Sequence, residues 1–228
     1  MTENKTAESI QLLSEYVTAH KKGLIEQVLK FRTRFVTVVL EDIYQSQNAS
    51  AVVRTCDCFG IQDVHIIENE NKYKLNPNVV MGASKWVDIH QYNSGENNTR
   101  DCINQLKKSG YKIVATSPDK QYKSINDYVL SDKTALLFGT EKEGLSEEAF
   151  HLADEVIRIP MYGFTESYNL SVSTALCLNV FTTQLQKSLL NWHLTDEEMS
   201  EIKLQWYRNI VNKSEFLEKK YLNLKKRK

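Results

Sequence analysis

Three short polar clusters in this sequence combine hydroxyl, amide, carboxylate and guanidinium groups, and each follows a predicted strand. They span residues 48–54, 139–144 and 166–169. Open α/β sheets bind ligands at the carboxyl ends of their strands, and a helix N-terminus that follows such an end favours anions. The clusters therefore predict one ligand site built from loops. Capping of ordinary core helices is the alternative explanation, and the local pattern does not decide between the two.

The third cluster lies in the stretch that organises the rest of the chain. Residues 156–159 form a predicted strand, which Pro160 stops because proline has no backbone donor. Gly163 gives the following loop freedom to turn tightly. From Leu170 onward apolar residues recur at helical spacing. The candidates for the N-cap of that helix are Ser167, Asn169 and Ser171.

The elements that must position these clusters alternate between strands and helices. Apolar, β-branched runs predict strands at residues 35–40, 64–67, 112–116, 134–138 and 156–159. Helices are predicted at residues 48–59, 100–109 and 146–152. This alternation with short connections is typical of an α/β fold in which helices cover both faces of a parallel sheet.

The two ends of the chain have a different, helical pattern. Residues 4–31 carry apolar residues at three- and four-residue spacings, with a possible break at Gly23. Near the other end, Thr195 and Glu198 form a capping box ahead of an apolar stripe. We therefore predict an N-terminal helical extension over residues 1–32, a central domain over 33–190, and a C-terminal helical extension with a basic tail over 191–228.

Composition is that of a globular protein without a membrane span. The 228 residues are 41% hydrophobic and 25% charged, and no apolar run is long enough to cross a bilayer. The N-terminus lacks the apolar region of a signal peptide. Four scattered cysteines predict reduced thiols, and with them a cytoplasmic location. Five isolated histidines show no metal-ligand spacing, so no metal is expected.

The 29 basic residues equal the 29 acidic ones, so any binding of nucleic acid must depend on local patches. One basic group lies near the start of the chain and another at its end. Their candidate RNA-binding residues are Lys21, Lys22, Arg32, Arg34, Lys225, Lys226, Arg227 and Lys228. Solvated helix faces and a frayed terminus are the alternative explanation for these charges.

Common catalytic motifs are missing. The sequence has neither a glycine-rich dinucleotide motif after its first strand nor a phosphate-binding P-loop, which argues against the usual dehydrogenases and nucleotide hydrolases. It also lacks a nucleophile elbow, which argues against the common hydrolases.

The three clusters, with their flanking residues, resemble the motifs of the SpoU-type SPOUT RNA 2′-O-methyltransferases. Residues 48–60 (NASAVVRTCDCFG) resemble motif 1, residues 137–146 (LFGTEKEGLS) motif 2, and residues 159–173 (IPMYGFTESYNLSVS) motif 3. All three occur in order over residues 34–190. The flanking helices, without a separate N-terminal RNA-binding domain, most resemble the TrmH branch, which methylates guanosine in the tRNA D loop.

This resemblance implies a fold, an assembly and a cofactor. It implies a C-terminal deep trefoil knot, a homodimer, and S-adenosylmethionine bound in a bent form by the knot loops. The positions implied for cofactor binding, mainly through backbone groups, are Thr116, Gly139, Ile159, Met161 and Tyr168. Two residues depart from the family pattern: Glu166 stands where relatives often have Gln, and Tyr168 where many have Leu.

The same resemblance implies five catalytic positions. Arg54 is the family's catalytic residue. A guanidinium is very hard to deprotonate, so we expect Arg54 to clamp a phosphate and the hydroxyl rather than to act as the base. Asn48 is expected to orient Arg54 or the RNA backbone, and Glu141 to pair with Arg54 or Lys142 or to hold its loop. Ser167 and Asn169 are expected to contact the substrate and fix the cofactor loop.

The function implied is S-adenosylmethionine-dependent methyl transfer to a ribose 2′-hydroxyl of RNA. A sulfonium is already a strong methyl donor, so the protein must align the hydroxyl with the methyl group and help to remove its proton. The expected substrate is a tRNA guanosine. The alternatives are a ribosomal RNA substrate, or a knotted RNA-binding protein without catalysis.

Overall fold

The computed structural model describes residues 3–74 and 76–225. Their contacts divide the chain into two compact units. One is Thr33–Trp192, and the other joins Met1–Arg32 to His193–Lys228. Within the described ranges, no helix combines the length and apolar character needed to span a membrane.

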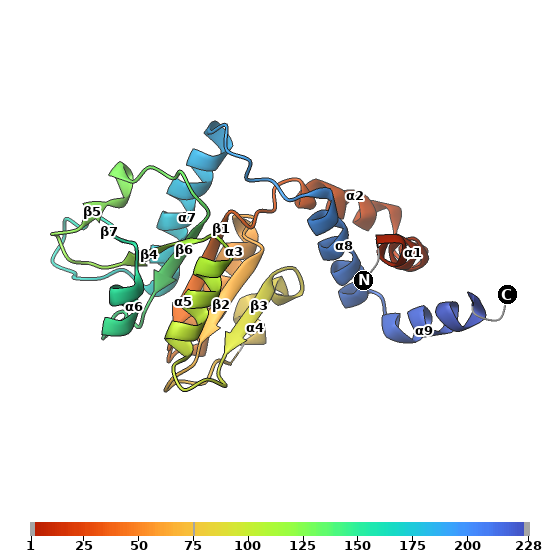
Figure 1. Ribbon diagram of the computed structural model, residues 1–228, viewed down its shortest axis with the longest axis horizontal. Helices are drawn as coiled ribbons and strands as arrows, with labels where there is room; N and C mark the ends of the chain where they lie inside the picture. The colour runs from red at the N-terminus through yellow and green to blue at the C-terminus, as the bar shows by residue number, and fades with distance from the viewer. Residues whose placement is uncertain (1–2, 75, 226–228) are drawn as a thin grey trace. The chain divides into compact units, whose positions relative to one another are not determined.

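A seven-stranded sheet forms the centre of the larger unit, with strand order β3-β2-β1-β6-β4-β7-β5 (Figure 1). All neighbouring strands are parallel, as predicted. The strands are β1 (Val36–Glu41), β2 (Asp63–Ile67), β3 (Asp88–Tyr92), β4 (Lys112–Thr116), β5 (Lys123–Ser124), β6 (Thr134–Phe138) and β7 (Glu155–Arg158). The central strands β1, β2 and β6 are buried throughout, which explains why β1 and β6 are mostly apolar runs rather than alternating ones.

Helices cover both faces of this sheet. They are α3 (Ser46–Cys58), α4 (Pro77–Val80), α5 (Asn98–Lys108), α6 (Glu147–Leu152) and α7 (Leu170–Lys187), with 3-10 turns η1 (Ala83–Lys85) and η2 (Ile125–Asp127). On one face α3 and α7 pack in a core with Val38, Leu136 and Phe181. On the other face α5 and α6 pack against Val39 and Leu137. Because neighbouring residues of a strand point to opposite faces, each strand contributes to both cores.

The smaller unit consists of helices. They are α1 (Glu3–Ser14), α2 (Ala19–Leu29), α8 (Asp196–Ile210) and α9 (Ser214–Lys225). The predicted capping box of Thr195 and Glu198 is present at the start of α8. The break predicted at Gly23 is wrong, because Gly23 lies inside α2. The interruption precedes Thr18, whose side chain caps α2 by accepting a hydrogen bond from the Lys21 amide.

Two strands and a short helix were not predicted from the sequence. β3 is one of the two edge strands, and none of its five residues is fully buried, so its sequence DIHQY lacks the apolar run of the central strands. β5 has two residues and α4 has four, lengths at which periodicity carries no information.

Candidate active site

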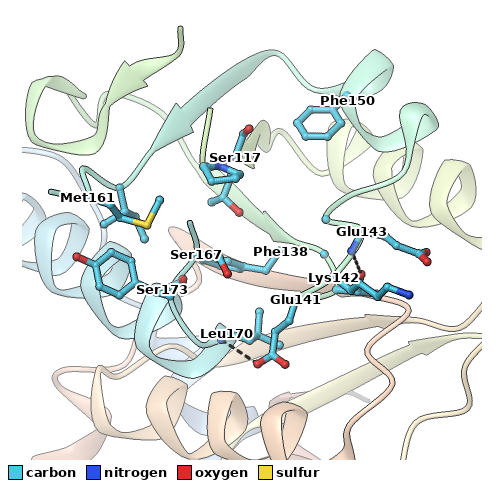
Figure 2. Close-up of a pocket in the computed structure, with 17 residues that line it drawn as sticks. Ser117, Phe138, Glu141, Lys142, Glu143, Phe150, Met161, Ser167, Leu170 and Ser173 are labelled. Carbon is cyan, nitrogen blue, oxygen red and sulfur yellow. Dashed lines mark hydrogen bonds between the residues drawn. The ribbon is translucent and has the colours of Figure 1, made fainter. Parts of the chain in front are cut away.

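A cavity of about 290 Å³ opens where β4, β6 and β7 end. All five residues predicted to bind a cofactor line it, together with Ser167. Those five are Thr116, Gly139, Ile159, Met161 and Tyr168. In Figure 2, Met161 and Phe150 lie on opposite sides of this cavity and Ser167 lies between Met161 and Phe138. The structure thus brings residues from three loops, far apart in sequence, onto one surface.

The loop after β6 is closed tightly on itself. Thr140 and Gly144 exchange two backbone hydrogen bonds of 3.0 Å, and the Glu143 amide donates to the Thr140 hydroxyl over 3.0 Å. Gly144 has φ +75°, a conformation that favours glycine. A Cβ at Gly139 would lie 2.0 Å from the Gly144 carbonyl oxygen. Only glycine fits at position 139, and its lack of a side chain lets the loop form one wall of the cavity.

Glu141 is the centre of a hydrogen-bond network at the mouth of the cavity. Its Oε1 accepts hydrogen bonds from Asn48 Nδ2 (2.7 Å) and Asn169 Nδ2 (3.0 Å), and Figure 2 shows its longer bond from the Leu170 amide. Asn169 Nδ2 also donates to Asn48 Oδ1 over 3.2 Å. One residue of each predicted cluster takes part, so the three loops are tied to one another. Of the three roles expected for Glu141, pairing with Arg54 or with Lys142 is not seen, and the hydrogen bonds agree with the third, that of holding its loop.

Each partner of Glu141 is also placed by a helix. Asn48 lies in the first turn of α3, not in the loop before it, and it bonds to Glu141 rather than to Arg54. Asn169 is the N-cap of α7, and its Oδ1 accepts from the Ser171 amide over 2.9 Å. Capping and a place in the site therefore coexist at Asn169.

Arg54 is the one predicted catalytic residue that neither joins this network nor lines the cavity. It lies further along α3 with an exposed side chain, and it lines neither this cavity nor the second one described below. Its side chain makes no hydrogen bond or ion pair to residues 3–74 or 76–225. A single chain therefore holds Arg54 apart from Asn48, Glu141 and Asn169.

The predicted basic patch at the start of the chain needs correction. Arg32 is 1% exposed, and its guanidinium carbon lies 5.2 Å from the centre of the Trp206 ring, so it has no access to an RNA phosphate. Arg34 donates to Asp63 over 3.0 Å and to Asp88 over 3.1 Å, which neutralises its charge. Lys21 and Lys22 remain partly exposed on α2. Lys226, Arg227 and Lys228 lie outside the described residues, as does the side chain of Lys225.

A second cavity of about 370 Å³ adjoins the first and shares residues 140–143 and Leu170 with it. Its other walls come from the loops after β1 and β2, and they include Tyr44, Asn48, Glu70 and Asn71. Tyr44 and Glu70 were not among the predicted site residues. Both stand just beyond the carboxyl ends of predicted strands, so the rule that located the other clusters also applies to them.

A buried carboxylate supports the loop of Glu141 from behind. Glu41, at the end of β1, accepts hydrogen bonds from the hydroxyls of Thr99 (2.6 Å) and Ser146 (2.7 Å) and from the Ser146 amide (2.8 Å). Ser146 is the N-cap of α6. Glu41 therefore joins β1 to the start of α6 with its charge fully hydrogen-bonded, as burial of a carboxylate requires.

A titratable cluster lies on β2 and β3. The histidines predicted to be isolated include two neighbours in space, His65 and His90, whose ring centres are 4.7 Å apart. The hydrogen bond to Asp63 raises the pKa of His90, whereas burial and the charge of His90 lower the pKa of His65 to about 4. Burial alone would raise the pKa of Asp63, but His90 and Arg34 outweigh it and hold that pKa below its usual value. In the described part of the chain, no group of three His, Cys, Asp or Glu side chains is arranged to hold a metal ion.

Known proteins resemble this chain in sequence and in structure. The tRNA (guanosine(18)-2'-O)-methyltransferase of Borreliella burgdorferi is 44% identical over 209 residues, which cover 92% of this chain and 94% of that protein. The enzyme of the same name from Thermus thermophilus is 34% identical over 75% of this chain and 84% of its own length.

Two solved structures have the same fold. The TrmH/SpoU tRNA modifying enzyme of A. aeolicus matches with a TM-score of 0.74 and 30% identity, over 85% of this chain and 98% of that one. The SpoU methyltransferase AviRb of Streptomyces viridochromogenes, solved in complex with AdoMet, matches with a TM-score of 0.59 and 20% identity over 71% of this chain and 65% of that one. The profile of the SpoU rRNA Methylase family matches residues 35–179, and this chain belongs to that family.

Proposed function

We propose that this chain transfers a methyl group from S-adenosylmethionine to the ribose 2′-hydroxyl of a guanosine in the D loop of tRNA. The observation that carries the proposal is the joining of three loops, by Asn48, Glu141 and Asn169, at the mouth of a cavity. The names of the relatives support tRNA guanosine as the substrate. The proposal also places the protein in the cytoplasm, where tRNA is found.

The first cavity fits the cofactor. Its walls combine apolar side chains, among them Phe138 and Met161, with backbone of the loops after β4, β6 and β7. Such walls suit an adenosine group held through its ring faces and edges. Glycine at position 139 lets the loop that forms one wall close on itself, because a Cβ there would clash with the Gly144 backbone. When bound, S-adenosylmethionine supplies an electrophilic methyl group.

The protein's own residues align the hydroxyl and help to remove its proton. Asn48 and Asn169 hold Glu141 in one orientation, so the mouth of the cavity is pre-organised for a ribose. Arg54 would bind a phosphate beside the target, since its guanidinium stays charged and offers a planar pair of donors. Ser167 lines the same cavity, where it would contact the substrate.

The proposed enzyme is a homodimer. On α7, Val172 and Leu176 stand one turn apart and are exposed, a stripe that a second copy would bury. The helix that carries Arg54, α3, covers the same face of the sheet as α7. A dimer formed through this face would bring Arg54 close to the partner subunit. The proposal includes the deep trefoil knot that the family resemblance implies.

Ribose-methylation mapping of total RNA tests the proposal. RNA from cells with and without this protein is compared at every position, and a methylated D-loop guanosine of tRNA should be lost without it. Purified protein should restore that mark on unmodified tRNA. Loss of a ribosomal mark with unchanged tRNA would favour the ribosomal alternative, and no change in either RNA would favour binding without catalysis.

A further inference from the structure

The second cavity offers side chains that the fold does not use. Tyr44 is 80% exposed, so the face of its ring is open to a ligand. Neither the Tyr44 hydroxyl nor the Glu70 carboxylate makes a hydrogen bond to residues 3–74 or 76–225. Glu141 on the shared wall is, by contrast, already bonded to two amides. Tyr44 and Glu70 are therefore free to bind a ligand.

The loop that carries Glu70 is held firmly. Asp42 Oδ1 accepts hydrogen bonds from three successive amides, those of Asn69 (2.7 Å), Glu70 (2.8 Å) and Asn71 (3.1 Å). The Asp42 carbonyl also accepts from Asn71 Nδ2 over 3.0 Å. Asp42 adopts φ +52°, which is strained for a residue other than glycine, and such strain is concentrated at functional sites. The backbone that carries Glu70 is thus held at the cavity before a ligand arrives.

The charges around this cavity select for a neutral ligand rich in donors. Glu70, Glu141 and Glu143 line it against a single lysine, Lys142, so a phosphate group is disfavoured. Its volume of about 370 Å³ is enough to hold a nucleobase. A ribose at the mouth of the first cavity would place its base close by, because the two cavities share a wall.

We propose that the second cavity is a guanine subsite, in which Glu70 binds the Watson–Crick edge of the target base and Tyr44 stacks on its face. Guanine presents two adjacent donors, N1–H and the N2 amino group, that match the two oxygens of a carboxylate. Adenine, cytosine and uracil lack this pair. Recognition of an unstacked base by aromatic stacking and edge contacts is the usual mode for RNA. The inference rests on the proposed function and adds the residues that select the base.

The test uses tRNA that carries either guanosine or inosine at the methylated position. Inosine lacks only the N2 amino group, so it keeps one of the two hydrogen bonds to Glu70. Wild-type protein should methylate the inosine tRNA with a kcat/KM roughly 10- to 100-fold lower. For the Glu70→Gln variant, kcat/KM with the guanosine tRNA should fall by about the same factor, and kcat/KM for the two tRNAs should differ by less than about threefold.

Three matched variants complete the experiment. Glu96→Gln removes an exposed carboxylate that lines neither cavity. This variant should keep the wild-type preference for guanosine tRNA over inosine tRNA. Tyr44→Phe keeps the stacking surface and should behave as wild type, whereas Tyr44→Ala should raise KM about tenfold. Calorimetry with S-adenosylmethionine and thermal melting should give wild-type values for every variant, which separates lost recognition from lost folding.

The possible results separate this inference from the function on which it rests. Equal methylation of guanosine and inosine tRNA by the wild-type protein overturns the guanine subsite and leaves the methyltransferase proposal standing. Loss of discrimination in Glu143→Gln instead of Glu70→Gln overturns the assignment to Glu70. Methylation of neither tRNA overturns both proposals.

Discussion

Replacement of Gly139 by alanine tests how the cavity wall is built. The added Cβ would lie 2.0 Å from the Gly144 carbonyl oxygen, 2.1 Å from its carbon and 2.3 Å from the Leu145 nitrogen. All three are backbone atoms, so no side chain can rotate away. The backbone at Gly144 must retreat by roughly 1.4 Å to reach the 3.4 Å of ordinary contact.

That retreat breaks the closure of the loop. The two hydrogen bonds between Thr140 and Gly144 are now 3.0 Å long and would exceed bonding distance. Each is worth about 1 kcal/mol net, and overpacking adds about 1–3 kcal/mol of strain. We therefore expect Gly139→Ala to lower the free energy of unfolding by about 3–5 kcal/mol. Affinity for S-adenosylmethionine should fall at least about tenfold, because residues 139–144 line the cavity.

Urea unfolding and calorimetry measure these two effects, and Gly23→Ala provides the control. A Cβ at Gly23 meets nothing within 4 Å, and this glycine lies inside α2. Alanine there should stabilise the protein by about 0.5–1 kcal/mol and leave cofactor binding unchanged. A Gly139→Ala protein with wild-type stability and wild-type affinity for S-adenosylmethionine would refute the close contact of residue 139 with the Gly144 backbone and its role in shaping the cavity.

Four further predictions concern catalysis, assembly, RNA binding and pH. Arg54→Ala should abolish methyl transfer while cofactor affinity stays within about twofold, since Arg54 does not line the cavity; a normal single-turnover rate would contradict its role. Light scattering at micromolar concentration should give the mass of a dimer, and a monomer would exclude the α7 interface. Truncation after Leu224 should weaken tRNA binding, and the plot of log binding constant against log salt concentration should become shallower by roughly 0.7–0.9 per lost phosphate contact. An unchanged slope would show that the basic tail does not contact the RNA. Burial and His90 hold the pKa of His65 at about 4, so the contribution of neutral His65 to stability is full above pH 6.5 and is progressively lost as the pH falls towards 4. The free energy of unfolding of His65→Gln should therefore decrease less steeply than that of the wild type between pH 6.5 and 4. An equal decrease in the two proteins would refute this.

The sheet was predictable where burial leaves a pattern in the sequence. The central strands are buried on both faces, so they read as apolar runs, and their parallel order follows from the alternation with helices. β3 was missed because an edge strand can carry Asp88 and His90, whose partners Asp63 and Arg34 lie far away in sequence. Local pattern does not contain such pairings.

The same limit applies to the site. That the three clusters would meet was predictable, because the carboxyl ends of parallel strands share one edge. The choice of partners was not: Asn48 and Glu141 are 93 residues apart, and nothing local indicates that they bond. At Arg32 the local pattern predicted an exposed charge that the fold buries. It belongs to a basic run typical of a solvated face, yet its side chain is covered through contact with Trp206.

Asn169 shows how a residue that looks like an ordinary cap can still indicate function. Asparagine, aspartate and serine cap helices about equally well, so capping of α7 alone does not require an amide. The Asn169 side chain uses Oδ1 for the cap and directs Nδ2 to Glu141 and Asn48. Aspartate would keep the cap but bring a second negative charge to Glu141, and the hydroxyl of serine is too short to reach both ends. The amide is therefore explained by the site, and the cap by the helix that positions it.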